Sequence, residues 1–283
     1  MELTKPFLRF FDELKKKRYK TWSIYDYFFS GRDHSRDRVD VLLRIDVDTC
    51  FHLCPRIAEE LDKRNLKGSF FFLTFPERYY SLWNSSIPKK ISDMGFEVGL
   101  HSDHYYEQLI SNIDAIERIK EDVKRLSDLI GKPIHGMVYH GHNEIDKLGK
   151  WNGEVYMDIE PELLGLSYHD GKKSLYSKFI DKNWRPNTDY YLSDYITFRG
   201  WGTYYWRYYP SYPIKILRRT QKGKSIHVCL HPQDMFNWWK KWDYSFNEKK
   251  QDRLDLFTSM TNFIGTRMIL QVKPIIDRFR KNE

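Results

Sequence analysis

The feature that most constrains this fold is a regular alternation of short β-type segments with longer segments, several of which have helical periodicity. Such alternation is typical of βα units that build a parallel sheet. It predicts an α/β fold. The predicted strands are residues 41–48, 69–75, 96–101, 134–140, 163–170, 189–194 and 225–232.

The segments between these strands carry helix signals. One helix is predicted at 54–65, where Ile57, Ala58 and Leu61 are spaced for one buried face. The longest helix is predicted from about 106 to 130, and a last one from about 248 to 279. No low-complexity linker or internal repeat interrupts the pattern. We therefore expect a helical lead-in over residues 1–38 and a single domain over 39–283.

Polar side chains stand at the ends of the predicted strands. Apolar strands have no need to finish in an acid or a histidine, yet six of the seven do so. In barrels of parallel strands the active site is assembled from the C-terminal ends of several strands. The pattern therefore predicts a site. The strand-end residues are Asp46 and Asp48, Thr74, His101, His140, His169 and Asp170, Asp194, and His231.

Asp46 and Asp48 lie two apart on one strand, so both carboxylates project from the same face. Two neighbouring acids repel each other unless a cation or a shared proton intervenes. We interpret Asp48 as a metal ligand and Asp46 as a base that takes a proton from water. A pair of aspartates capping the following helix is the structural alternative.

His101 and His140 supply imidazole from two other strands. One aspartate with two histidines suits zinc, and also cobalt, nickel, manganese or iron. His231 is the candidate general acid, and Asp194 could orient its imidazole. Each also has a structural alternative, since His231 precedes Pro232 in a turn and Asp194 could cap a turn.

Charge and cysteine content limit the class of protein. The net charge is +8, from 47 basic and 39 acidic residues, but the charges are interspersed. No nucleic-acid motif is present, and weak attraction to a membrane surface stays open. The three cysteines, Cys50, Cys54 and Cys229, suit a reducing compartment, and buried thiols are the favoured interpretation over a Cys50–Cys54 metal pair. With neither a signal peptide nor a membrane-spanning segment in view, we expect a soluble, cytoplasmic protein.

Six motifs in order resemble the polysaccharide deacetylases of the NodB-homology type, from about Val41 to Phe236. They are RIDVD, GSFFFL, GFEVGLHSD, YHG, YLSD and LHPQ. The resemblance implies a distorted (β/α)7 TIM-like barrel. It also implies hydrolysis of an N-acetyl, N-formyl or O-acetyl group on a sugar or glycan precursor in surface-polysaccharide biosynthesis. In that scheme Asp46 is the base, Asp48 and His101 bind the metal, and His231 is the general acid.

This sequence departs from the family at two motifs. The family's second histidine falls at Tyr105, and we rank His140 above His104 as the third metal ligand, with Asp103 behind both. The arginine of the usual third motif is also missing. Arg44 shares a strand face with the two acids, so it could pair with Asp46 and keep it ionised.

Three residues are assigned to substrate binding. They are Arg44, Tyr139 and Trp201, the last of which opens the aromatic segment 201–212. Aromatic faces pack well against sugar rings, and core packing is the alternative. Two rivals to the deacetylase hypothesis remain: a zinc glycosidase on a related barrel, and a glycan-binding homologue without metal.

Overall fold

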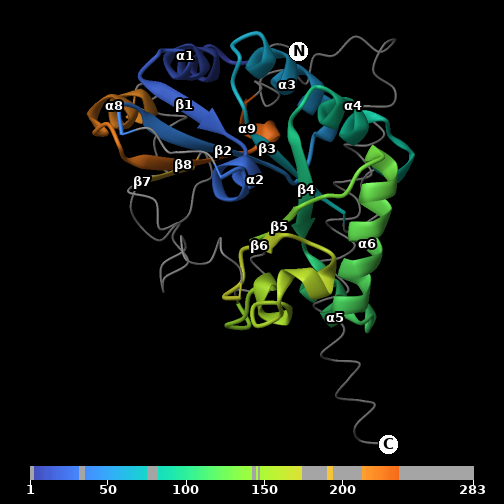
Figure 1. The fold of residues 1–283 in the computed structure, drawn as a ribbon. Helices are drawn as coiled ribbons and strands as arrows, with labels where there is room; N and C mark the ends of the chain where they lie inside the picture. Colours follow the sequence, from blue (N-terminus) through green and yellow to red (C-terminus); the bar gives the residue numbers. More distant parts are fainter. Residues whose placement is uncertain are drawn as a thin grey trace, which may run out of the picture.

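The structure is a computed structural model that describes residues 3–31, 36–74, 82–141, 145, 147–173, 190–193 and 212–235. One curled parallel sheet lies at its centre, with helices packed against it (Figure 1). Within the described residues, no helix is long and apolar enough to cross a membrane.

The sheet contains eight strands in the described part of the chain. Seven of them follow the order β6-β5-β4-β3-β2-β8-β7, and the pairings between neighbours in this order are parallel. These seven are the strands that the sequence pattern predicts. Their bounds are β2 Val39–Val47, β3 Ser69–Leu73, β4 Glu97–Ser102, β5 Gly136–Tyr139, β6 Tyr168–His169, β7 Tyr190–Ser193 and β8 Ser225–Leu230.

An eighth strand, β1 (Tyr19–Trp22), lies in the segment for which the sequence predicts only helix. Residues 39–42 of β2 pair with β1, and residues 44–47 pair with β3. Because β8 pairs with residues 40–45 of β2, β1 and β3 must share the other edge of that strand. The lead-in therefore contributes to the sheet as well as packing on it.

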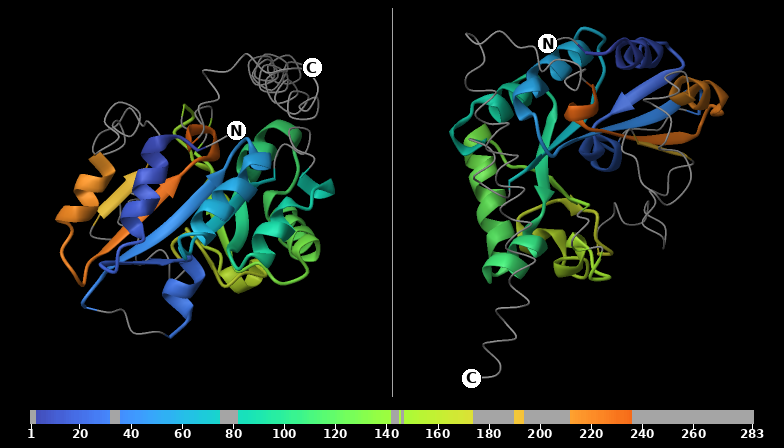
Figure 2. Two further views of the ribbon diagram at one scale, coloured as in Figure 1. Left: turned by 90° about the horizontal axis from the view of Figure 1, so that it is seen from above. Right: turned by 180° about the vertical axis from the view of Figure 1, so that it is seen from behind.

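Helices form a layer around the outer face of the sheet. Neighbours in this layer contact one another in the order α8, α1, α3, α4, α6. Figures 1 and 2 show α1 and α3 on one side of β2, with α2 on the other. The bounds are α1 Lys5–Leu14, α2 Ile24–Phe29, α3 Cys54–Asp62, α4 Ile87–Asp93, α5 His104–Ser111, α6 Ala115–Ile130, α8 Tyr212–Arg219 and α9 Pro232–Met235, with the short 3-10 helices η1 Phe51–Leu53, η2 Leu82–Asn84, η3 Asn152–Val155 and η4 Pro161–Leu164.

The single helix predicted from 106 to 130 is two helices. Asn112 adopts a left-handed conformation at the end of α5, with φ 59°. Asp114 then caps α6 by accepting hydrogen bonds from the backbone N–H groups of Ile116 and Glu117. The apolar periodicity continues through this break, which is why periodicity alone did not detect it.

The inner face of the sheet is closed at the end opposite the strand C-termini. Phe71, Val138 and Tyr168 pack there with Ile24 of α2. A Cβ on Gly99 would lie 2.5 Å from the Phe71 ring, so this strand position has to be glycine for the ring to pack. The Tyr168 hydroxyl and the Ser69 hydroxyl each donate a hydrogen bond to Glu97.

The predicted fold class, an α/β protein with a distorted barrel-like sheet, is confirmed. Among the described residues, β6 and β7 do not pair with each other. The predicted helix at 248–279 lies outside the described residues, and the domain boundary at residue 38 stays a prediction.

Candidate metal centre

Strand alternation puts a column of polar side chains on the inner face of the sheet. In register, Asp46 of β2 lies beside Phe71 of β3, and Arg44 lies beside Cys229 of β8. His101 of β4 lies beside Val138 of β5 and shares a face with it. The ends of β2, β4, β5 and β8 therefore bring acids and histidines from distant parts of the chain together.

Asp48, His101 and His140 form one cluster. Each offers a ligand atom, and these atoms all lie within 4.8 Å of one another. His101 Nε2 lies 3.1 Å from Asp48 Oδ1, and the two imidazole rings are 5.2 Å apart between centroids. His101 Nδ1 is 3.2 Å from the Val138 carbonyl oxygen. That contact selects the tautomer with a proton on Nδ1, which leaves the Nε2 lone pair for a metal.

His140 is half-buried beside a second carboxylate. Its Nδ1 lies 3.5 Å from Asp103 Oδ1. Burial disfavours the charged imidazole, but Asp103, with Asp48 and Asp46, raises the pKa of His140 to about 9. A metal ion would have to displace that proton, so ion binding here releases acid.

Arg44 forms two hydrogen bonds with the Asp46 carboxylate. Arg44 donates from Nε to Asp46 Oδ1 at 2.6 Å and from Nη2 to Oδ2 at 2.5 Å. Burial of Asp46 favours its neutral form, but the charge of Arg44 outweighs this and brings the pKa to about 2. The predicted pairing of the two residues is present. Asp46 is therefore a carboxylate at neutral pH.

His231 stands on the other side of Asp48, with Nε2 3.8 Å from Asp48 Oδ2. Burial raises the pKa of Asp48, and the charge of His231, together with the neighbouring His101 and His140, brings it well below its ordinary value. His231 also belongs to a second group with Asp46 and Cys229, whose ligand atoms lie within 4.8 Å. Asp46 and His231 thus flank the cluster of Asp48, His101 and His140.

The donor set fits a divalent cation. One carboxylate and two imidazoles converge from three strands, and a carboxylate with two histidines is a common set for zinc and its neighbours in the transition series. An oxygen also lies near the Nδ1 atom of each imidazole, the Val138 carbonyl at 3.2 Å from His101 and the Asp103 carboxylate at 3.5 Å from His140. Such outer partners are the usual support of metal-binding histidines.

Other predicted residues lie elsewhere. The imidazole of His104 is fully buried between Ser102 Oγ and Asp122 Oδ2, so it does not join the cluster. Tyr139 ends β5, next to His140, and its ring packs edge-on against Trp151. Its assignment to substrate binding stays a prediction. Asp194 and Trp201 lie outside the described residues.

Cys229 is a site residue that the sequence did not reveal as one. It was predicted only as a buried thiol, yet it donates to Asp46 Oδ2 at 3.4 Å. The signal was available, because His227, Cys229 and His231 follow the period of two on one strand face. Asp170, one of the predicted strand-end residues, is buried and accepts hydrogen bonds from the Tyr139 N–H and the Tyr156 hydroxyl, and so ties β6 to the end of β5.

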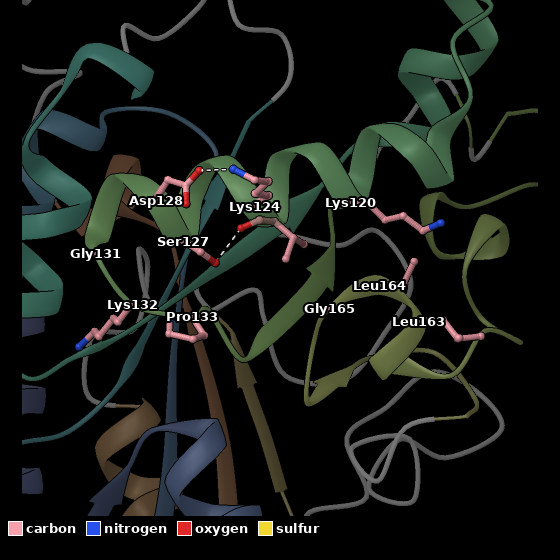
Figure 3. A pocket seen from close by; sticks show the side chains of 11 residues that line it. Lys120, Lys124, Ser127, Asp128, Gly131, Lys132, Pro133, Leu163, Leu164 and Gly165 are labelled. Carbon is pink, nitrogen blue, oxygen red and sulfur yellow. Dashed lines mark hydrogen bonds and ion pairs between the residues drawn. The ribbon is translucent and has the colours of Figure 1, made fainter.

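A surface groove of 780 Å³ lies away from this centre. It is lined by residues of α6, of the segment that follows it and of η4, among them lysines and apolar side chains (Figure 3). None of the residues that line it belongs to the two clusters. Its lining includes Lys120, Lys124, Lys132, Val123 and Leu164.

Comparisons with known proteins find similarity among solved structures. No protein-family model and no curated protein matches the chain. A deacetylase from Streptococcus pyogenes in complex with acetate is 13% identical, with a TM-score of 0.40, over 58% of this chain and 70% of that one. The catalytic domain of a peptidoglycan N-acetylglucosamine deacetylase from Eubacterium rectale is 13% identical, with a TM-score of 0.38, over 78% and 84%.

A CE4 family pseudoenzyme from Bacillus anthracis is 16% identical, with a TM-score of 0.31, over 68% of this chain. The match spans 54% of the length of that pseudoenzyme. The solved structures to which this chain is similar thus include deacetylases, a CE4 esterase from Streptococcus mutans and a CE4 family pseudoenzyme.

Proposed function

We propose that this protein is a metal-dependent hydrolase that removes an acyl group, N-acetyl foremost, from a carbohydrate. The observation that carries the proposal is the convergence of Asp48, His101 and His140 within 4.8 Å, with the ionised Asp46 and with His231 beside them. A ligand set flanked by one base and one acid is an arrangement suited to metal-assisted amide hydrolysis.

The residues divide the reaction between them. Asp48, His101 and His140 would hold the ion, which would supply Lewis-acid polarisation and lower the pKa of water. Asp46 is ionised and accepts a proton at Oδ2, the oxygen that faces His101 at 3.7 Å. His231 donates a proton to the leaving nitrogen, so that the sugar departs as an amine. Arg44 holds the Asp46 carboxylate in one orientation through two hydrogen bonds.

One observation favours a second candidate, a glycan-binding protein without catalysis. Both oxygens of Asp46 accept from Arg44, and its pKa of about 2 lies far below the value that suits a base at neutral pH. A carboxylate held in this way is a weak base. The two candidates differ in turnover, not in the ability to bind a sugar.

The substrate and its compartment are part of the proposal. We infer a cytoplasmic enzyme that acts on an N-acylated sugar, a nucleotide sugar or another precursor of a surface polysaccharide. Zinc is the favoured ion. Support comes from the cysteine content, because an odd and sparse set of three cysteines suits a reducing compartment. The net charge of +8 favours an anionic substrate such as a nucleotide-linked sugar.

The decisive experiment measures acetate and formate released from a panel of N-acylated sugars and nucleotide sugars after loading with zinc or cobalt. Asp46→Asn should lower kcat by a factor of about 10² to 10⁴, the usual contribution of a positioned acid or base. Asp122→Asn is the matched control, because Asp122 is equally buried but pairs with His104 outside the cluster.

Three other results would each contradict part of this proposal. Unchanged turnover in Asp46→Asn would remove Asp46 as the base. Sugar binding without acyl release, by protein that takes up no zinc or cobalt, would favour the binding protein. Labelling of an aspartate by a fluorosugar would favour a zinc glycosidase.

A further inference from the structure

Asn152 connects three elements behind the candidate metal centre. It stands at the first position of η3, with its side chain 1% exposed. Its Nδ2 donates to Asp103 Oδ1 at 2.5 Å and to the His140 carbonyl oxygen at 2.7 Å. Its Oδ1 accepts from the Tyr106 backbone N–H at 3.0 Å. One amide therefore links the end of β4, the residue after β5 and the first turn of α5.

The carboxylate that Asn152 holds is the one that faces His140. Asp103 is 3% exposed, and the oxygen that accepts from Asn152, Oδ1, lies 3.5 Å from His140 Nδ1. A proton on Nδ1 leaves Nε2 as the ring nitrogen with a free lone pair. Fixing Asp103 therefore fixes which nitrogen of His140 can reach an ion.

The backbone of His140 is held by the same amide. His140 donates its N–H to the Ser102 carbonyl at 2.8 Å, and its own carbonyl accepts from Asn152. Both ends of this peptide position are thus fixed just beyond the last residue of β5. Asn152 acts on the main chain and, through Asp103, on the ring.

We propose that Asn152 and Asp103 form a positioning pair that orients His140 as a metal ligand. The inference rests on the metal centre of the proposed function and adds two residues to it. In this chain Tyr105 stands where a second histidine of the β4 motif is expected. His140, just after β5, takes the place of that histidine as a ligand, and the Asn152–Asp103 pair fixes its orientation. Neither residue touches the ion, the substrate or the reacting atoms.

The test compares ion binding in three single variants. Asn152→Leu keeps most of the side-chain volume and removes all three hydrogen bonds. Asp103→Asn keeps the shape and an acceptor oxygen, but it loses the charge opposite His140. Asp122→Asn is the matched control, because it removes the charge opposite His104, which lies outside the cluster.

Two readouts separate positioning from folding. Zinc affinity is measured by competition with a chromophoric chelator, and Co²⁺-loaded protein gives a visible ligand-field spectrum that reports the ligands themselves. Loss of an outer partner costs about 10-fold to 100-fold in metal affinity. We expect that loss, with an altered Co²⁺ spectrum, in Asn152→Leu and a smaller loss in Asp103→Asn. Asp122→Asn should match the wild type in both readouts.

The double variant Asn152→Leu/Asp103→Asn should bind zinc no more weakly than Asn152→Leu, because both substitutions act through His140. If Asn152→Leu does not fold, Asp103→Asn alone carries the test. Wild-type affinity and spectrum in the folded variants would overturn the positioning pair and leave the proposed function standing. A wild-type protein that binds neither zinc nor cobalt would overturn both.

Discussion

At the scale of single residues, the pairing of Arg44 with Asp46 dominates the electrostatics of the site. Arg44 lies beside two carboxyl groups with different titration behaviour. The pKa of Asp46 is brought to about 2 by its charge. The pKa of buried Asp170 is raised by burial, although Arg44 opposes this. The direct two-point contact with Asp46 explains the difference, because Asp170 instead accepts from Tyr156 and the Tyr139 backbone.

Replacing Arg44 with methionine should destabilise the protein by about 3 to 5 kcal/mol at pH 7, since it leaves a buried charge without its partner. In the wild type the pKa of Asp46 is depressed from 3.8 to about 2. The ionised carboxylate therefore stabilises the folded state above pH 3.8, and this stabilisation is lost as the pH falls through 2. Without Arg44, burial raises the pKa of Asp46 instead. The loss of unfolding free energy in Arg44→Met, relative to the wild type, should therefore become smaller as the pH is lowered towards 4.

Urea unfolding at pH 7 and at pH 4.5 measures this effect. Arg44→Met/Asp46→Asn is the control, because it removes both charges and should be less destabilised at pH 7 than Arg44→Met alone. An equal loss of unfolding free energy in Arg44→Met at both pH values would show that the charge of Asp46 is not the cause of the destabilisation.

At the scale of elements, the boundary between α5 and α6 separates Asp103, beside the candidate metal centre, from Asp122, which lies outside it. Helix α5 starts directly after Asp103, and the Glu107 N–H donates to the Asp103 carbonyl. Helix α6 supplies Asp122, which holds His104 in place. The Asp114 cap separates the two helices, so each packs with its own orientation.

Asp114→Ala should lower the free energy of unfolding by about 1 kcal/mol, because it removes the acceptor for two N–H groups of the first turn of α6. Thermal or urea unfolding measures the change. Asp128→Ala, an exposed position in the last turn of the same helix, should change stability by less than about 0.5 kcal/mol. Equal effects at the two positions would contradict the assignment of Asp114 as the cap.

At the scale of the whole molecule, the candidate metal centre joins strands that are distant in sequence. Its ligands come from the ends of β2, β4 and β5, separated by 53 positions between Asp48 and His101 and by 39 between His101 and His140. An unfolded chain does not bring them together. An ion that binds the folded state alone therefore stabilises the entire sheet.

Zinc at about 100 times its Kd should add about 2.7 kcal/mol to the free energy of unfolding, and a chelator should reverse the gain. Denaturant unfolding with and without zinc gives the increment. His140→Ala should abolish it, whereas His104→Ala should retain it, because His104 contacts Ser102 and Asp122 outside the cluster. Retention of the full increment in His140→Ala would exclude His140 as a ligand.

Local pattern alone was enough to predict the seven strands of the main sheet order and the face on which Asp46, Asp48 and His101 stand. The alternation of side chains between the two faces of a strand depends only on neighbouring residues, so it can be predicted from the sequence. The same pattern also predicted His140 and His231 as site residues, because each lies at the end of a predicted strand. The strand β1 was missed, since its pairing with β2 is a long-range contact with little local signal.

Tertiary structure decided which polar residues meet. His104 and His140 both follow a strand, but only the curl and register of the sheet bring His140 to Asp48 and bury His104 against Asp122. The contacts of Asn152 with Asp103 and His140 likewise depend on where η3 packs. Periodicity acts between neighbours in the chain, whereas ligand geometry depends on distances between segments that only the folded sheet brings together.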